Sequence, residues 1–406
     1  MQLRFNVIWL ILIVAVGMFS LLYLWFSLFP GRVGPGIGNY FSAEQINQGR
    51  QYNNVLRLAY LTNFLVQVLF LLWLVFSGRA EAFSHRMQQV AGSYSGGILL
   101  FFLTLWLLLK LLDLPFTLFS SYYWQHQWGF STQSLGAWWL DYIKGSGLEL
   151  VLSAMGVGLL FWVINRLPNA WWLAGAGFVS LWIVFQTFLW PVVVSPMFNR
   201  FTPVEDPTVN SMVHKLSEQA GLPVDQAFVM DASRRTTKAN AYFTGLGQTK
   251  RIVLYDTLLA DYPPEQVEAV VAHEMAHWRL GHITRGLLLG ILGSFVAWGL
   301  LFVVLRTTLP VSGRAQPYAW AVILLFFMLA SFFSGPLQNY FSRSMELEAD
   351  RSAVILTGNV PAAVRLQVDL AAKNVSDVAP APFIQWFSYS HPPALKRIEI
   401  LQQALH

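Results

Sequence analysis

The chain has 406 residues, of which 55% are hydrophobic and only 12% are charged, and its formal net charge is +5. Because soluble domains carry about 25% charged residues, this composition excludes an ordinary soluble protein and favours one surrounded by lipid. The lack of cysteine excludes disulfides and thiolate metal sites, and without a dense basic run we expect no nucleic-acid partner.

Seven apolar stretches approach or reach the roughly 20 residues that a helix needs to cross the hydrocarbon core. The first is uncharged and longer than the apolar region of a typical signal peptide, and no small-residue cleavage site follows it. We therefore interpret it as a retained span and predict a mainly α protein built on a seven-helix transmembrane bundle. The stretches cover residues 7–29, 58–77, 96–120, 148–164, 171–194, 286–305 and 318–333.

Two charged residues, Lys110 and Asp113, lie within the third stretch. They are three positions apart, so they could pair on one helical face. Charges at this depth usually face a protein interior or a water-filled cavity. We favour an internal ion pair over a contact with substrate, and either interpretation indicates that the bundle is not dry throughout.

Two polar segments follow the fifth and the seventh stretch, at 195–285 and 342–406. In the first segment, apolar residues at helical spacing between 209 and 216 predict an amphipathic helix that ends at Gly221. Short runs of β-type residues then predict a small β-sheet. These runs lie at 227–230, 241–245 and 251–255.

A second helix is predicted from Pro264, with proline in its first turn, to about His282. It carries the sequence His273-Glu274-Met275-Ala276-His277, an HExxH motif. Residues at i and i+4 share a helix face, so both imidazoles can bind one zinc ion, and the glutamate can accept a proton from a zinc-activated water. The alternative is a pair of buried histidines that are hydrogen-bonded to their neighbours.

A catalytic zinc needs a third protein ligand. His282 is badly placed, because five residues after His277 it points about 140° round the helix. The last two stretches are joined by about a dozen residues and should form an antiparallel hairpin, which brings the segment after the seventh stretch beside the motif. There Glu346 and Asp350 share a helix face and Glu348 points away, so we predict Glu346 as ligand and Asp350 as acceptor for a ligand imidazole. A solvated acidic helix end is the alternative.

These features divide the chain into four parts. Residues 1–195 form an N-terminal membrane domain with five spans, and 196–285 form a metallopeptidase segment with the HExxH helix. Residues 286–341 form the sixth and seventh transmembrane helices. Residues 342–406 form a C-terminal metallopeptidase segment with the third zinc ligand.

Extended motifs in this order resemble one family, the type I CAAX prenyl proteases. The family consists of integral-membrane zinc metalloproteases with seven spans around a large water-filled chamber. The N-terminal half matches mainly in span count and in FSAEQINQGRQY at 41–52. The C-terminal half matches in PMFNRFTPVED at 196–206, NAYFTGLGQTKRIVLYDTLL at 240–259, HEMAHWRLGH at 273–282, SRSMELEAD at 342–350 and SYSHPPALKRI at 388–398.

The resemblance implies one Zn²⁺ per chain, held by His273, His277 and Glu346. It also implies that Glu274 is the general base and that Asp350 sits beside the site. The fold that it implies is a seven-span bundle around a water-filled chamber, with an HExxH zinc metallopeptidase domain that carries a small β-sheet.

Four further residues enter the candidate site. Asn240 resembles the edge-strand residue that binds the substrate backbone, although from the residues alone a turn residue is equally plausible. His391 resembles the histidine that stabilises the oxyanion, although without the family a plain loop residue would be favoured. Arg397 is expected to support the site, and His282 is assigned a structural role near the metal.

The predicted function is a zinc metalloendopeptidase that removes the C-terminal tripeptide from prenylated proteins. Its partners would be peptide or protein substrates, prenylated or membrane-associated, and the lipid bilayer. One alternative is a quality-control protease for membrane proteins. A remote alternative is a non-proteolytic zinc membrane protein such as a transporter, but that class should place its histidines and acids inside the spans, whereas here they lie at span ends.

The distribution of basic residues predicts the orientation. Seven spans place 19 Lys and Arg residues on the catalytic side and six on the other, with Lys110 inside a span. The excess predicts a cytoplasmic catalytic face. We expect a multi-pass protein of the bacterial inner membrane or the endoplasmic reticulum membrane, depending on the host.

Overall fold

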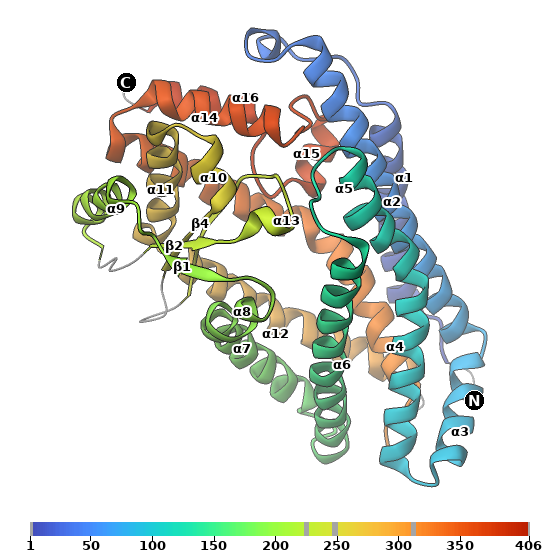
Figure 1. Ribbon diagram of the computed structural model, residues 1–406. Coiled ribbons are helices and arrows are strands. Elements are labelled where there is room, and N and C mark those ends of the chain that lie inside the picture. The colour runs from blue at the N-terminus through green and yellow to red at the C-terminus, as the bar shows by residue number, and fades with distance from the viewer. Residues whose placement is uncertain (1–2, 223–226, 246–250, 310–313, 405–406) are drawn as a thin grey trace.

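The computed structural model confirms the mainly helical fold, with seven helices long and apolar enough to cross a membrane. It describes residues 3–222, 227–245, 251–309 and 314–404. Figure 1 shows the long helices extending from a smaller mixed unit that contains the β-strands. The seven helices are α1 (Val7–Leu28), α2 (Ala43–Phe76), α4 (Tyr94–Leu118), α6 (Leu135–Arg166), α7 (Trp171–Leu189), α12 (His282–Thr308) and α13 (Ala319–Thr357).

Several of these helices extend beyond the stretches that the sequence predicts, because hydropathy detects only the part of a helix that is apolar. Helix α2 begins at Ala43, where the side chains of Ser42 and Gln45 form a capping box. Helix α13 has 39 residues and runs without interruption past the apolar part to Thr357. The predicted boundary between residues 341 and 342 therefore lies inside one helix.

The connections between spans contain helical structure that the sequence analysis did not find. Helix α3 (Arg79–Ala91) joins α2 to α4. Helix α4 continues through a π-helical turn into α5 (Trp124–Gln127), and α7 continues through a similar turn into α8 (Ser195–Phe198). In the connection between α12 and α13, residues 310–313 lie outside the described part of the chain.

The β-sheet has four strands in the order β1-β2-β4-β3. Strands β2 and β4 are parallel, whereas β1 pairs antiparallel with β2 and β3 pairs antiparallel with β4. Three of the strands were predicted, and β1 was missed because it has only three residues. Strand β3 lies at an edge of the sheet. The strands are β1 (Phe201–Pro203), β2 (Ala227–Met230), β3 (Ala241–Thr244) and β4 (Arg251–Tyr255).

Helices pack around the sheet and bury a second apolar core. The largest fully buried side chains of this core are those of Leu216, Ile252, Leu254, Leu258 and Met275. They come from one strand and three helices, so the HExxH helix α11 is fixed to the sheet by apolar contact. The helices that contribute to this core are α9 (Pro207–Ala220), α10 (Asp256–Asp261), α11 (Pro264–Arg279), α14 (Val360–Lys373), α16 (Ala394–Gln403) and the C-terminal part of α13. Helix α15 (Pro382–Ser388) packs instead against α1 and α13.

The expected pairing of Lys110 with Asp113 is wrong. Lys110 Nζ lies 2.6 Å from Glu149 Oε2 on α6. Asp113 accepts hydrogen bonds of 2.8 Å from the Asn63 amide on α2 and the Thr117 hydroxyl. Each charge meets a residue of a neighbouring helix, which spacing along a single helix cannot reveal.

A buried ion pair connects α2 to the segment that follows α14. Arg57 Nη2 donates to Asp377 Oδ2 at 2.8 Å and to the Tyr389 hydroxyl at 2.8 Å. The Arg57 side chain is 7% exposed and that of Asp377 is 0% exposed. Breaking a buried pair of this kind by removing one partner costs about 3–5 kcal/mol. The contact therefore fixes the membrane helix α2 against the segment that leads to His391.

Candidate metal centre and active site

Three predicted ligands meet at one point. His273 and His277 lie one helical turn apart on α11, and their Nε2 atoms are 3.1 Å apart. Glu346 comes from α13, with Oε2 3.3 Å from His273 Nε2 and Oε1 3.4 Å from His277 Nε2. The uninterrupted course of α13 past the apolar span delivers Glu346 to α11, as the hairpin argument requires.

This cluster fits a zinc ion. Tetrahedral zinc binds nitrogen and oxygen at about 2.0–2.2 Å, which sets neighbouring ligand atoms about 3.3 Å apart. The three separations above agree with that spacing before any ion is added. Glu346 Oε2 is also buried and has no hydrogen-bond partner within the described residues. Two imidazoles and one carboxylate are a donor set that suits zinc.

Asp350 and Arg397 fix the orientation of His273. Asp350 Oδ1 lies 3.0 Å from His273 Nδ1. Arg397 holds the same carboxylate through Nη2 at 2.6 Å and Nε at 2.8 Å. With Nδ1 donating to Asp350, the lone pair of His273 Nε2 is free to face the metal position. The predicted neighbours of the site therefore lie beside a predicted ligand.

We expect Asp350→Asn to weaken zinc binding or peptidase activity by about 10- to 100-fold, because a neutral amide orients the His273 imidazole less strongly. Zinc affinity is measured by competition with a chelator, and activity is measured with a peptide substrate. Asp261→Asn, at a carboxylate that is 47% exposed, is the matched control. Unchanged affinity and activity in Asp350→Asn would contradict the positioning role.

His282 begins α12 directly after Gly281, whose φ of 67° allows the sharp turn between α11 and α12. Its Nδ1 lies 2.8 Å from His277 Nδ1, and its Nε2 lies 3.4 Å from Glu348 Oε2. His277 thus has a partner on the nitrogen that faces away from the cluster. Glu348 is held by Arg285 at 2.7 Å and points away from the three ligands, as expected.

Glu274 lies between the metal cluster and the edge of the sheet. Its Oε2 accepts a hydrogen bond of 3.0 Å from the backbone N–H of Phe243 on β3. Burial raises the pKa of Glu274, whereas His273 and His277 act in the opposite direction. A general base works best with a pKa near the working pH. The environment therefore suits a carboxylate that accepts and returns a proton beside β3.

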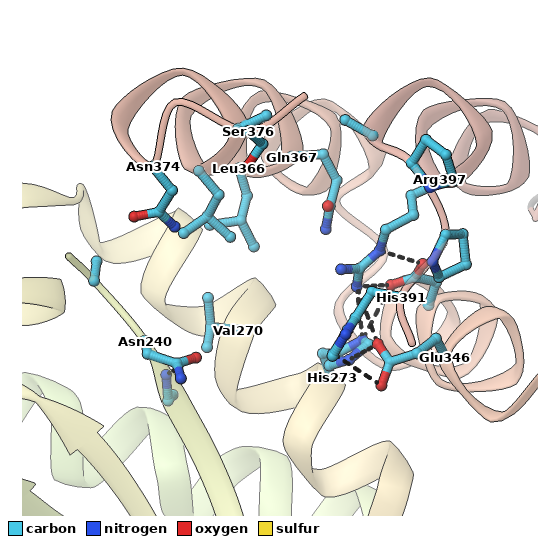
Figure 2. Close-up of a pocket in the computed structure, with 18 of the residues that line it drawn as sticks. Asn240, Val270, His273, Glu346, Leu366, Gln367, Asn374, Ser376, His391 and Arg397 are labelled. Carbon is cyan, nitrogen blue, oxygen red and sulfur yellow. Dashed lines mark hydrogen bonds and ion pairs between the residues drawn. The ribbon is translucent and has the colours of Figure 1, made fainter. Parts of the chain in front are cut away.

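His391 and Asn240 face the same cavity from different sides. His391 Nε2 lies 3.4 Å from Glu346 Oε1. Asn240 is exposed and directly precedes β3, where its Oδ1 accepts the N–H of Ala241 at 2.9 Å. Figure 2 shows Asn240 across the pocket from Gln367, with His391 and Glu346 grouped at one end. The structure brings His391 to the metal cluster and leaves Asn240 on the strand wall.

The cavity has a volume of about 820 Å³ and is lined by residues that the sequence analysis did not assign. Helix α2 contributes Tyr52 and Asn53, and the segment before β3 contributes Lys238. A signal for Tyr52 was present, because it is the last residue of the matching block at 41–52. Of the block at 240–259, residues 246–250 lie outside the described part of the chain.

Two models of known protein families match the chain. Residues 203–405 match the model of peptidase family M48. Residues 30–200 match the model described as CAAX prenyl protease N-terminal, five membrane helices. The chain belongs to peptidase family M48. It has seven apolar helices, and His273, His277 and Glu346 form a group that could hold a metal ion, so this M48 protein is a multi-pass membrane metalloprotease.

Individual relatives agree with this M48 assignment. CAAX prenyl protease 1 of Saccharomyces cerevisiae is 31% identical over 72% of this chain and 69% of the relative. The uncharacterized metalloprotease YhfN of Bacillus subtilis is 32% identical over 66% of this chain and 65% of the relative. A crystal structure of S. mikatae Ste24p matches with a TM-score of 0.82 at 24% identity, covering 96% of this chain and 99% of that one. This last match shows that the fold is shared.

Proposed function

We propose that the protein is a zinc metalloendopeptidase that removes the C-terminal tripeptide from prenylated, membrane-associated substrates. The observation that carries the peptidase part is the cluster of His273, His277 and Glu346, whose ligand atoms all lie within 4.8 Å of one another and which adjoins Glu274. The substrate class is supported by a yeast relative named CAAX prenyl protease 1 and a plant relative named CAAX prenyl protease 1 homolog. It also agrees with the membrane-embedded fold.

The proposed mechanism assigns one task to each side chain. His273, His277 and Glu346 hold zinc, which when bound acts as a Lewis acid and lowers the pKa of water to about 7. Glu274 accepts the proton of the attacking water and returns it to the leaving amine. His391 donates a hydrogen bond to the oxygen on which negative charge develops.

The edge strand β3 offers a binding surface for an extended peptide. Antiparallel pairing of β3 with β4 leaves the other edge of β3 without a partner strand among the described residues. A peptide that adds to this edge is held by main-chain hydrogen bonds, which tolerate varied side chains. Asn240 would assist by turning its side-chain amide from the Ala241 N–H, where it now lies at 2.9 Å, to the substrate backbone.

For the orientation, we propose that the catalytic face is cytoplasmic, in the bacterial inner membrane or the endoplasmic reticulum membrane according to the host. The support is the excess of 19 basic residues on the catalytic side over six on the other. A cytoplasmic face is also where prenylated C-termini would have to meet the site.

The test is cleavage of a farnesylated peptide with a CAAX C-terminus and of its unprenylated twin by the detergent-purified protein, with and without a zinc chelator. We expect the prenylated peptide to be cleaved with release of a tripeptide, and the chelator to stop the reaction. Equal cleavage of both peptides would instead support a quality-control protease. No cleavage of either peptide by zinc-loaded protein would overturn the proposal.

A further inference from the structure

Lys238 lies on the wall of the active-site cavity, two residues before Asn240. Its backbone is fixed, because the carbonyl oxygen accepts the Thr257 hydroxyl at 3.0 Å. Its ammonium donates to the Tyr52 hydroxyl at 2.8 Å and lies 4.2 Å from the centre of the Phe130 ring. These contacts hold the positive charge at one place beside the cavity.

Among the described residues, the charge of Lys238 has no carboxylate partner. Two Lys or Arg residues line the cavity, and the other one, Arg397, is held by Asp350. Within the described residues, no ion pair of 4.0 Å or less reaches Lys238. The Tyr52 hydroxyl donates its own proton to Gln125 Oε1 at 2.9 Å, so it accepts from Lys238. An ammonium has three N–H donors, so Lys238 can donate to a ligand as well as to Tyr52. Burying half of a cation without a counter-ion costs free energy. An anionic group of a ligand would offset this cost beside the Lys238 ammonium.

The register of β3 indicates which anionic group can reach this place. Because the Tyr255 N–H donates to the carbonyl oxygen of Asn240 at 3.0 Å, residues 241 and 243 direct their backbone groups to the free edge. A peptide antiparallel to β3 would pass Phe243 first and Ala241 next, and would then run toward Lys238. Glu274 marks the position of the reacting bond, since its carboxylate lies 3.0 Å from the Phe243 N–H.

Only a few substrate residues fit between the reacting bond beside Glu274 and the side chain of Lys238. We set the scissile bond after the substrate residue opposite Tyr242, next to Phe243. A peptide that continues in extended form past the start of β3 at Ala241 would then place its next three residues opposite 241, 240 and 239. An extended strand advances about 3.4 Å per residue, so a carboxylate that ends the third residue arrives at the side chain of Lys238. A free C-terminus farther along the substrate would pass beyond it, and one nearer would fall short.

Resting on the proposed peptidase function, we propose that Lys238, presented by the Tyr52 hydroxyl, binds the α-carboxylate at the C-terminus of the substrate. This contact selects peptides with a free C-terminus about three residues after the scissile bond. It also selects the antiparallel direction on β3, because the parallel direction would bring no carboxylate to the cation. The anionic ligand is thus the C-terminal carboxylate of a peptide.

The test compares a farnesylated peptide that ends in a free acid with the same peptide ending in a carboxamide. We expect the wild-type protein to prefer the acid, mainly through KM. We expect Lys238→Met to lower the acid-to-amide ratio of kcat/KM by about 10-fold or more, which is typical of a lost hydrogen bond to a charged group. Lys238→Arg should restore part of the ratio. Lys215→Met, at a side chain that is 63% exposed on α9, is the control that should keep it.

A purely structural role for Lys238 gives a different result. Lys238→Met would then slow both peptides by the same factor and leave the ratio unchanged, which would overturn the proposal. If the wild-type protein cleaves neither peptide, the proposed function fails. The role of Lys238 is then tested by measuring how tightly the acid and the amide peptide bind to zinc-loaded Glu274→Gln protein. Tighter binding of the acid peptide, lost when Lys238→Met is added to Glu274→Gln, supports the carboxylate site. Equal binding of the two peptides, or no binding of either, overturns it.

Discussion

Glu274→Gln is expected to lower kcat by at least about 100-fold while zinc remains bound, because proton transfer by a positioned side chain contributes about 10²–10⁴-fold to the rate. Glutamine has nearly the same shape, and its amide oxygen can still accept the Phe243 N–H that now lies 3.0 Å from Glu274 Oε2. It cannot take a proton from water at neutral pH. The measurements are kcat with the farnesylated peptide and the zinc content of the purified protein.

The matched control is Glu265→Gln, in the first turn of the same helix α11. It removes the same charge but lies more than two turns from the metal cluster, so activity should be close to that of the wild type. Substantial turnover by Glu274→Gln with a full complement of zinc would contradict the assignment of Glu274 as base. Loss of activity together with loss of zinc would instead mean that Glu274 is needed for zinc binding.

Local spacing and the order of the spans were sufficient to predict which residues of the metal cluster lie together. The i, i+4 spacing of His273 and His277 sets both imidazoles on one helix face, whatever surrounds that helix. Glu346 required one more step, because only the hairpin of the last two spans brings it to α11. That the span and the Glu346 segment form one continuous helix, α13, could not be predicted, since hydropathy falls where the helix leaves the apolar part of the chain.

Contacts across long sequence separations were beyond the sequence analysis. Arg57 and Asp377 are 320 residues apart and pair through a buried contact. Lys110 was assigned the wrong partner for the same reason, because Glu149 lies on another helix. Lys238 resembled any other basic residue until α2 was seen to place Tyr52 beside it. In each case the partner depends on how helices pack, which periodicity along one helix does not encode.

Glu346→Gln is expected to lower zinc affinity by more than the roughly 100-fold that marks the upper range for a residue that only orients a ligand. The carboxylate oxygen Oε2 is buried, lies 3.3 Å from His273 Nε2 and has no hydrogen-bond partner in the described part of the chain, so it is available to bind a metal ion. A neutral carboxamide is a weaker ligand and does not balance the charge of the ion. Activity should be lost with the metal, and added zinc should no longer raise the Tm, because a ligand stabilises only the protein that binds it.

Glu348→Gln is the matched control on the same helix. Its carboxylate is 37% exposed, pairs with Arg285 at 2.7 Å and points away from the cluster, so zinc affinity and the zinc-dependent rise in Tm should be retained. Wild-type zinc affinity in Glu346→Gln, or loss of zinc in Glu348→Gln alone, would show that the third ligand was assigned to the wrong acid. Together with Glu274→Gln, which should lose the rate and keep the metal, the pair separates the carboxylate that binds zinc from the one that moves the proton.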